Sequence, residues 1–402
     1  TMSKPYWLEV PLIEGSKDKV KDGEILIVGS GLAGVSTAYW LQQKGFTDLT
    51  LVDHQASEAA SFRNCGHILY GTVESMLAMV ALHGQDVAKD LWQLSIDICH
   101  EVRDTVKREN LSVDYKQDGY LVIAVEESEN QEILRSIELL NRYGFQSDYV
   151  EKKELEKKGF REVFGGRFEA GSAQAHPTKF RNDLLKICLD RGLKYFSKVK
   201  VLAMDENNSK VEIRIDGQAT VRYEAAVIAA NAYSPLLSDF FAKHRLVEPF
   251  RGQIICSKPL KKKLPVAYPH SFDHGYEYAI GTEDNRLMLG GWRNNTPGGE
   301  TGTYDITPNP MVEKGLAEFA AKHYAIDEEI IWEYSWSGIM AASKTGFPFI
   351  GPIDSQRIFT VSGFTGHGFS WAHGSAKYLA KIMAGEPIPE LVARQFNPRL
   401  VR

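Results

Sequence analysis

The sequence has few cysteines and no long hydrophobic run, and both absences exclude classes of protein. Its four cysteines, Cys65, Cys99, Cys188 and Cys256, lie far apart in the 402 residues. That spacing predicts neither a disulfide framework nor a zinc cluster, and isolated thiols are typical of a reducing compartment. No apolar run approaches the roughly 20 residues of a membrane helix, and no signal-peptide core is recognisable. We therefore expect a cytoplasmic protein without a transmembrane segment or a bound metal.

The chain also lacks an excess of one charge. A net charge of −5 gives no reason to expect a nucleic-acid partner. The composition, 43% hydrophobic and 25% charged, is typical of a globular protein. The length exceeds one ordinary hydrophobic core, so two domains are expected. The sequence leaves the oligomeric state open.

The clearest positive signal is a nucleotide-binding unit. An apolar run at 25–28 has the length of a buried strand, and the G-x-G-x-x-G segment 29–34 follows it. A helical pattern then runs to Gly45, and a second apolar strand at 49–52 ends in Asp53. In this arrangement the glycines permit a tight turn and a close approach to a pyrophosphate, while the acid accepts hydrogen bonds from a ribose. An acid at this position disfavours a 2′-phosphate, so the unit predicts FAD or NAD and disfavours NADP.

Patterns further along the chain divide it into alternating pieces. Helices are predicted over 73–110, 127–143, 179–191, 310–324 and 371–384, and two strands around a turn at 117–119 are predicted within 113–125. A buried strand at 224–231 ends in small residues, as a sheet requires where a ligand crosses it. We expect a leader at 1–21, a nucleotide-binding domain made of 22–75, 165–235 and 330–402, and a substrate domain made of 76–164 and 236–329.

Several segments together resemble the D-amino-acid-oxidase-like FAD oxidoreductases, the family of glycine and sarcosine oxidases. They are the turn 29–34 with Asp53, S-F-R-N-C-G-H-I at 61–68, the strand 225–231, W-S-G at 336–338, F-P-F-I-G at 347–351 and G-F-T-G-H-G-F at 363–369. The similarity covers about 22–390. Within the family it is strongest to the gamma-glutamylputrescine oxidases, which share a Tyr-Trp leader, here Tyr6-Trp7.

The resemblance implies an α/β fold with a discontinuous Rossmann-like FAD domain of the glutathione-reductase type and an inserted α+β substrate domain with a mixed or antiparallel sheet. It implies non-covalent FAD, because no cysteine lies in the segment where sarcosine-oxidase-type enzymes carry the flavin-linking one. Cys65 is the exception, because its loop should pass near the flavin, where the thiol could form a covalent link or take a redox role or could simply be buried. The residues that the resemblance and the nucleotide motif assign to FAD are Gly29, Ser30, Gly31, Leu32, Ala33, Gly34, Asp53, His54, Gln55, Ser61, Arg63, Asn64, Cys65, Gly66, Val201, Ala229, Ala230, Asn231, Gly338, Phe364, Thr365, Gly366, His367 and Gly368.

One departure from the family pattern concerns the substrate. Glycine and D-amino-acid oxidases have an arginine shortly after the W-x-G element, and its guanidinium clamps the substrate carboxylate. This chain has Met340 there, which favours an amine, or an amino acid held by other residues. Lys344 could supply the missing charge or could be an ordinary solvated lysine.

The other candidate catalytic residues are His67 and Tyr278, and each has an ordinary structural alternative. His67 follows the flavin loop, where it could face substrate or oxygen or could simply be hydrogen-bonded. Tyr278, with Tyr276 and Trp292, could form an aromatic cage for an amine or could pack in the sheet. Glu277 and Asp273 are possible anchors for a cationic substrate tail.

The reaction predicted by the resemblance is oxidation of a small amine. Hydride passes from the α-carbon to flavin N5, the imine hydrolyses, and electrons pass to O2 or another acceptor. The alternatives are a D- or N-methyl-amino-acid oxidase or dehydrogenase, a flavin-binding subunit without turnover of its own, and an NAD-only dehydrogenase.

Overall fold

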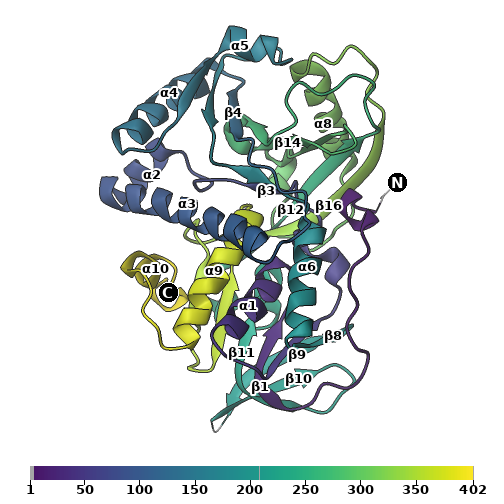
Figure 1. The fold of residues 1–402 in the computed structure, drawn as a ribbon, viewed down its shortest axis with the longest axis vertical. Helices are drawn as coiled ribbons and strands as arrows, with labels where there is room; N and C mark the ends of the chain where they lie inside the picture. The colour runs from purple at the N-terminus through teal and green to yellow at the C-terminus, as the bar shows by residue number, and fades with distance from the viewer. Residues whose placement is uncertain (1–3, 208, 402) are drawn as a thin grey trace.

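The computed structural model describes residues 4–207 and 209–401, and within them the chain forms two eight-stranded sheets joined by a helical layer (Figure 1). The predicted leader lies partly outside the described residues. Its described part begins with a short helical turn, Tyr6–Glu9, and buries Trp7. It then runs beside the first sheet, where Ser16 bridges to Phe196. The leader is therefore packed along the body of the protein.

The first sheet is the predicted nucleotide-binding sheet. Its strands are ordered β17-β18-β11-β1-β2-β8, and β9 and β10 extend it from β11. Because β1 pairs in parallel with both β2 and β11, the strand order reverses at β1, where such sheets bind ligands. The bounds are β1 Gly23–Val28, β2 Leu49–Asp53, β8 Lys194–Ser197, β9 Val201–Asn207, β10 Lys210–Ile215, β11 Val221–Ile228, β17 Phe349–Pro352 and β18 Ile358–Ser362.

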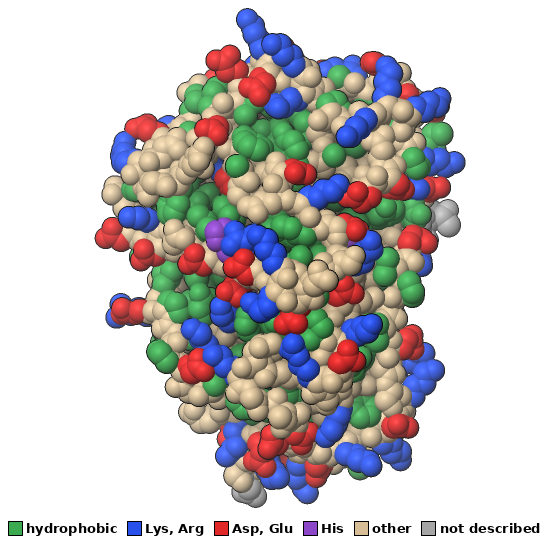
Figure 2. Space-filling model, viewed as in Figure 1, with side chains coloured by type: hydrophobic (Ala, Val, Ile, Leu, Met, Phe, Trp, Pro, Cys, Tyr) green, Lys and Arg blue, Asp and Glu red, His purple; other side chains and the backbone are tan. Residues whose placement is uncertain are grey.

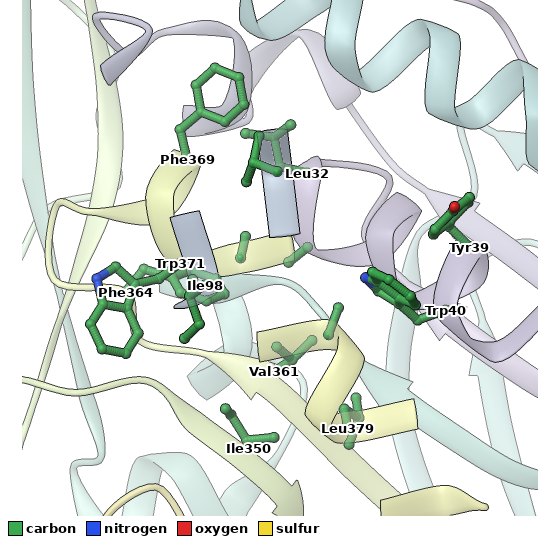
Figure 3. Packing of buried hydrophobic residues seen from close by; sticks show 14 of the residues in the cluster. Leu32, Tyr39, Trp40, Ile98, Ile350, Val361, Phe364, Phe369, Trp371 and Leu379 are labelled. Atoms are coloured by element: carbon green, nitrogen blue, oxygen red, sulfur yellow. The ribbon is translucent and has the colours of Figure 1, made fainter. Parts of the chain in front are cut away.

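Helices α1 (Leu32–Gln43), α6 (Pro177–Asp190) and α9 (Gly368–Met383) cover one face of this sheet (Figure 1). Figure 3 shows Leu32 and Trp40 of α1 in the same apolar cluster as Phe369 and Leu379 of α9. The first and last quarters of the chain therefore share one hydrophobic core.

The second sheet is mixed, with the order β16-β12-β15-β14-β13-β4-β6-β5. One face packs on α8 (Pro310–His323) through Leu121, Phe272 and Leu289. The bounds are β4 Tyr120–Ala124, β5 Asp148–Glu151, β6 Gly165–Glu169, β12 Val247–Ser257, β13 His270–Phe272, β14 Glu277–Gly281, β15 Leu287–Gly290 and β16 Trp332–Ser343.

The remaining elements pack around the two sheets. A two-stranded ribbon and six further helices are found among the described residues, and α3 crosses the middle of the molecule (Figure 1). Their bounds are α2 Met76–His83, α3 Gln85–Arg108, α4 Glu127–Arg142, α5 Lys152–Lys157, α7 Asp239–His244, α10 Glu390–Gln395, β3 His67–Ile68 and β7 Ala173–Gln174.

Three sequence-based expectations need correction. The helical pattern 73–110 is broken at Gly84, whose φ of +81° ends α2 before α3 begins. The predicted strand before the turn at 117–119 is absent, because that segment makes only a single bridge, from Lys116 to Gln174. Helix α9 begins at Gly368, earlier than the predicted 371, so its first turn includes the end of the glycine-rich segment.

Sheet membership also refines the predicted domain limits. Strands β6 and β16 lie within the pieces 165–235 and 330–402, which were assigned to the nucleotide-binding domain, yet both pair in the second sheet. Among the described residues, no helix has the length and apolar character needed to cross a membrane. Figure 2 shows acidic and basic side chains interspersed over the visible face.

Candidate functional site

A cavity of about 1120 Å³ lies between the two sheets. On one side it is lined by residues at the carboxyl ends of β1, β2 and β11 and by the start of α9. On the other side it is lined by residues of β12, β14, β16, β4 and β6 in the second sheet. The topology therefore brings both halves of the chain to one site.

The glycine-rich turn has the close contacts that its sequence predicts. Gly29 adopts a φ of +107°, which suits a residue without a side chain. A Cβ on Gly34 would lie 1.7 Å from the carbonyl oxygen of Gly29, so this contact between α1 and the turn requires glycine. A Cβ on Gly31 would lie 2.6 Å from Ser61 Oγ, which itself accepts a hydrogen bond from Leu32 N at 2.9 Å.

Asp53 closes this turn from the neighbouring strand. The backbone N–H of Ser30 donates to Asp53 Oδ2 at 2.6 Å, and the side chain lines the cavity together with His54 and Gln55. The acid therefore holds the turn and leaves carboxylate surface open to a ribose.

A buried guanidinium that the sequence analysis missed lies behind the turn. Arg181 of α6 donates to Ser30 O at 2.9 Å, to Ser30 Oγ at 3.0 Å and to Tyr195 OH at 3.2 Å. Its ring contacts are with Phe62 and Tyr195. Burial lowers its pKa from the ordinary value, while the nearby Asp53 carboxylate favours the charged form. A single arginine in a helix gives no sequence signal for this role.

The loop at 59–66 is held rigidly against the second sheet. Arg63 donates to Ser337 O at 2.6 Å, and the indole N–H of Trp336 donates to Arg63 O at 3.2 Å. The leader adds a third contact, because Trp7 Nε1 donates to Asn64 O at 2.6 Å. A Cβ on Gly338 would lie 2.9 Å from Arg63 Cβ, so the strand and the loop pack closely.

The glycine-rich segment near the C-terminus is tied to both sheets. Asn231, with a φ of +45°, accepts hydrogen bonds from Gly363 N at 2.9 Å and Phe364 N at 3.4 Å. Thr365 N donates to Ala341 O of β16 at 2.9 Å. Helix α9 then begins at Gly368 without a side-chain cap, so its first N–H groups and its positive end face the cavity.

The structure brings nearly all of the predicted cofactor residues to this cavity, and its donors fit an FAD. The glycine turn and the α9 N-terminus offer N–H groups, and the glycines at positions 29 and 31 leave space that a Cβ would fill. The predicted residues that line the cavity are Gly29, Gly31, Leu32, Ala33, Asp53, His54, Gln55, Ser61, Arg63, Asn64, Cys65, Val201, Ala229, Ala230, Asn231, Gly338, Phe364, Thr365, Gly366, His367 and Gly368.

Three predicted cofactor residues do not line the cavity. Ser30 turns its hydroxyl toward Arg181, and Gly34 packs inside the turn. Gly66, with a φ of +76°, packs against Ala175, where a Cβ would lie 2.7 Å from the carbonyl oxygen. These residues shape the site from behind.

Met340, Gly252, Tyr278 and His67 line one part of this cavity, which we call the chamber. A Cβ on Gly252 would lie 2.4 Å from Met340 Cε and 3.5 Å from Tyr278 OH, so both side chains lie over this glycine. The ring centroids of His67 and Tyr278 are 6.2 Å apart.

The chamber is electrically neutral at these two side chains. Burial lowers the pKa of His67 to about 3, and its Nε2 lies 3.1 Å from Ala279 O, so the neutral ring carries its proton on Nε2. Burial raises the pKa of the Tyr278 hydroxyl, and burial also raises the pKa of the Cys65 thiol, which lines the same cavity. All three groups are uncharged near neutral pH.

Several sequence candidates lie away from the cavity. Lys344 is exposed just after β16 and its backbone N–H donates to Leu246 O. Trp292 packs on Gly315 of α8, and Glu277 lies on the α8 face of β14 with its pKa raised by burial to about 8. Neither Trp292 nor Glu277 borders the cavity, so of the three predicted cage residues only Tyr276 and Tyr278 line it.

Two arginines border the cavity that the sequence analysis did not select. The Arg293 guanidinium lies 4.5 Å from the centroid of the Phe250 ring, and Phe250 pairs with Met340 across β12 and β16. The Arg167 guanidinium of β6 lies 5.5 Å from the centroid of the Trp92 ring. Alternation along β6 could have placed Arg167 on one face, but only the sheet order shows that this face meets the cavity.

Known proteins share this architecture and sequence pattern. The DAO family model, described as FAD dependent oxidoreductase, matches residues 24–382. A gamma-glutamylputrescine oxidoreductase from Escherichia coli is 23% identical over 372 residues, covering 90% of this chain and 84% of the relative. A probable oxidoreductase, OrdL, from Haemophilus influenzae is 23% identical over 377 residues, covering 92% and 84%.

Solved structures with the same fold include two oxidoreductases. L-proline dehydrogenase from P. horikoshii has a TM-score of 0.76 at 19% identity, covering 94% of this chain and 98% of that chain. Glycine oxidase from Geobacillus kaustophilus has a TM-score of 0.74 at 19% identity, covering 92% and 96%. The predicted α/β fold class is confirmed.

Proposed function

The chain belongs to the DAO family of FAD dependent oxidoreductases, and from that premise we propose that it oxidises a C–N bond of a small amine to an imine, which water then hydrolyses. The observation that carries the proposal is that the uncharged side chains of Met340, Tyr278 and His67 line the same cavity as the glycine-rich turn. FAD, when bound, supplies the hydride acceptor.

The chain's own contribution to this reaction is position and exclusion of water. An amine must be deprotonated to give hydride from its α-carbon, and a chamber without a fixed negative charge favours the neutral amine. Tyr278 OH and His67 are neutral there and can orient the substrate without exchanging a proton with it. No acid or base on the chain is assigned.

The proposed cofactor contacts follow the sequence motifs. Gly29, Gly31 and Leu32 would hold the pyrophosphate, Asp53 the adenosine ribose, and the loop 59–66 with the first turn of α9 the flavin end. A non-covalent complex is supported by Cys65, whose thiol stays protonated because burial raises its pKa. A covalent link would need the thiolate, which is the nucleophilic form. These assignments are supported by the cavity lining.

A second candidate is an amino acid, favoured by Arg293. Its guanidinium donates to Gly299 O at 3.2 Å, and no ion pair is found for it among residues 4–207 and 209–401. The Arg293 guanidinium lies beside Phe250, which pairs with Met340. From there it could clamp a substrate carboxylate, which Met340 cannot do.

The test is anaerobic reduction of the bound flavin, followed by absorbance, with matched panels of primary amines and their α-carboxylated counterparts. We expect amines to bleach the flavin and Arg293→Met to leave their rates unchanged. Faster reduction by amino acids, lost in Arg293→Met, would instead establish the second candidate. If neither panel bleaches a fully loaded FAD protein, the proposed oxidation is wrong.

A further inference from the structure

The far end of the cavity contains a positive charge that the proposed oxidation does not use. Arg167 lies on the cavity face of β6, and its row across the sheet runs through Val122 and Ser271 to Tyr278. Each of these residues borders the cavity. Because neighbouring strands lie about 4.8 Å apart, the backbones of Arg167 and Tyr278 are separated by roughly 14 Å.

The Arg167 guanidinium makes no ion pair in the described part of the chain, and its nearest electrostatic support is the Glu169 carboxylate on the same strand, which favours the charged form. Its Nη1 is enclosed and has no hydrogen-bond partner there, and it takes part in no ion pair. Other poorly exposed arginines differ in this respect. Arg181 donates to Ser30 and Tyr195, and Arg251 is paired with Glu300. An enclosed unpaired charge is costly, so its retention needs a compensating ligand or role.

The carboxylates near Arg167 accept hydrogen bonds from other groups. Glu169, two residues further along β6, accepts from Gly171 N at 2.8 Å and from Ser172 N and Oγ at 3.1 and 2.9 Å. Glu129 accepts from the backbone N–H groups of His274 and Val125. Glu132, which borders the cavity beside Ile133, accepts a hydrogen bond from Ser75 Oγ at 2.6 Å. Within the described residues, these three carboxylates therefore accept their hydrogen bonds from groups other than Arg167.

The geometry of the guanidinium suits a planar anion. Its central carbon lies over the Trp92 ring, 5.5 Å from the centroid. A guanidinium in contact with an aromatic face can still donate from its edge N–H groups. The same end of the cavity is walled by Ile133 and Leu140 of α4, which would cover an alkyl chain. A carboxylate accepting two parallel hydrogen bonds is the ligand that such a site fits.

We infer that Arg167 binds a carboxylate carried by the substrate at the end remote from the oxidised C–N bond. This inference rests on the proposed function for the reacting end and adds that the substrate is an extended amine with an anionic tail. Arg167 is a specificity residue, and it takes no part in the oxidation itself.

The direct test uses ligands that cannot be oxidised. Binding of butanoate, hexanoate and octanoate, each paired with its amide, is measured by calorimetry on the FAD-loaded protein. We expect a carboxylate to bind more tightly than its amide in the unchanged protein. Arg167→Met should weaken the carboxylate by roughly 10- to 100-fold and leave the amide unchanged. Arg167→Lys should keep part of the preference.

Arg293→Met is the matched control, because it removes the other cavity guanidinium. The inference is overturned if no acid is preferred to its amide, or if the preference survives in Arg167→Met and is lost in Arg293→Met. Folding is checked by FAD content and thermal midpoint. Arg167→Met should change the thermal midpoint by only about a few degrees, since Arg167 makes no ion pair, although Glu169 loses a nearby positive charge. A large loss of stability would indicate a structural role and overturn the inference.

Flavin reduction separates this inference from the proposed function. With ω-aminooctanoate and octylamine as substrates, Arg167→Met should raise KM for the amino acid alone and leave both kcat values unchanged. If neither compound reduces the flavin while Arg167 still governs acid binding, the amine chemistry fails and the anion site stands. If both reduce it equally well in every variant, the anion site fails and the amine chemistry stands.

Discussion

At the scale of single residues, two glycines of the glycine-rich turn are needed for different reasons, Gly34 for packing and Gly31 for space beside the ligand. Gly34 faces the backbone oxygen of Gly29, so a larger residue there would disturb the contact between β1 and α1. Gly31 faces only the Ser61 hydroxyl. A substitution at position 31 can therefore be accommodated by the protein while it narrows the space for a pyrophosphate.

We predict that Gly31→Ala lowers FAD affinity by at least about tenfold, corresponding to about 1.4 kcal/mol. The added Cβ displaces Ser61 Oγ, which lies 2.6 Å away, and removes its hydrogen bond to Leu32 N. The measurement is titration of the FAD-free protein with FAD.

Gly144→Ala provides the control for the effect on folding. Gly144 has a φ of +86° in open space and lies outside the cavity, so alanine there should cost about 1 kcal/mol without changing FAD affinity. Equal FAD affinities for the two variants would mean that Gly31 does not approach the cofactor.

Single residues of the sequence also reveal little about the substrate. Met340 is recognisable as a missing clamp, but Arg293 lies in a short turn after β15 and Arg167 lies in β6, both far from Met340 in sequence. Arg293 contacts Phe250, which pairs with Met340, whereas the row from Arg167 runs through Val122 and Ser271 to Tyr278.

At the scale of elements, the link between β11 and the segment before α9 organises the site. Asn231 follows β11 and accepts from the backbone of Gly363, so one side chain joins the middle of the chain to its last quarter. The φ of +45° at Asn231 is a conformation that asparagine tolerates better than alanine does.

We predict that Asn231→Gly destabilises the protein by about 1–3 kcal/mol, because Gly363 N loses its acceptor. Asn231→Ala should cost about 1 kcal/mol more, since alanine adds the strain of a positive φ. Both should weaken FAD binding. The measurements are urea unfolding of the FAD-free protein and FAD titration.

Asn285 is a matched comparison, with a φ of +62° and a side chain that accepts from Leu264 N at 3.0 Å. It lies outside the cavity lining, so Asn285→Gly should lower stability without changing FAD affinity. Loss of FAD binding in this variant too would show that general destabilisation accounts for the effect.

At the scale of the whole molecule, the buried histidines make stability depend on pH. Burial lowers the pKa of His67 and His373 to about 3 and of His176 and His270 to about 4. In the unfolded chain each takes up a proton as the pH falls below about 6.5, while the folded chain stays neutral. The unfolded state therefore binds more protons, and stability falls with falling pH.

We predict that the free energy of unfolding falls between pH 6.5 and pH 5 by up to about 1.4 kcal/mol per pH unit for each such histidine. Glu277, whose pKa is raised to about 8, is protonated in the folded state and ionised in the unfolded state over this pH range. Its effect on the free energy of unfolding is therefore opposite in sign and cancels that of about one histidine. The measurement is urea unfolding at several pH values. His373→Gln should reduce the slope, and a slope equal to that of the unchanged protein would contradict the assignment.

The sequence alone determined the nucleotide-binding unit and the fold class. The strand, glycine turn, helix and terminal acid are local, so short-range periodicity and turn chemistry specify them before any long-range contact forms. The order of the further motifs was sufficient for the family, and most of the predicted cofactor residues border one cavity.

Only the tertiary structure decided which side chains share the substrate end of that cavity. Lys344, Trp292 and Glu277 are close to the right segments in sequence, yet strand alternation and the packing of α8 turn them away. Arg167, Arg181 and Arg293 carry no local signal, and they matter because sheet order and burial bring their charges to the site. A charge acquires a role from the groups around it, and in this chain those groups lie far away in sequence.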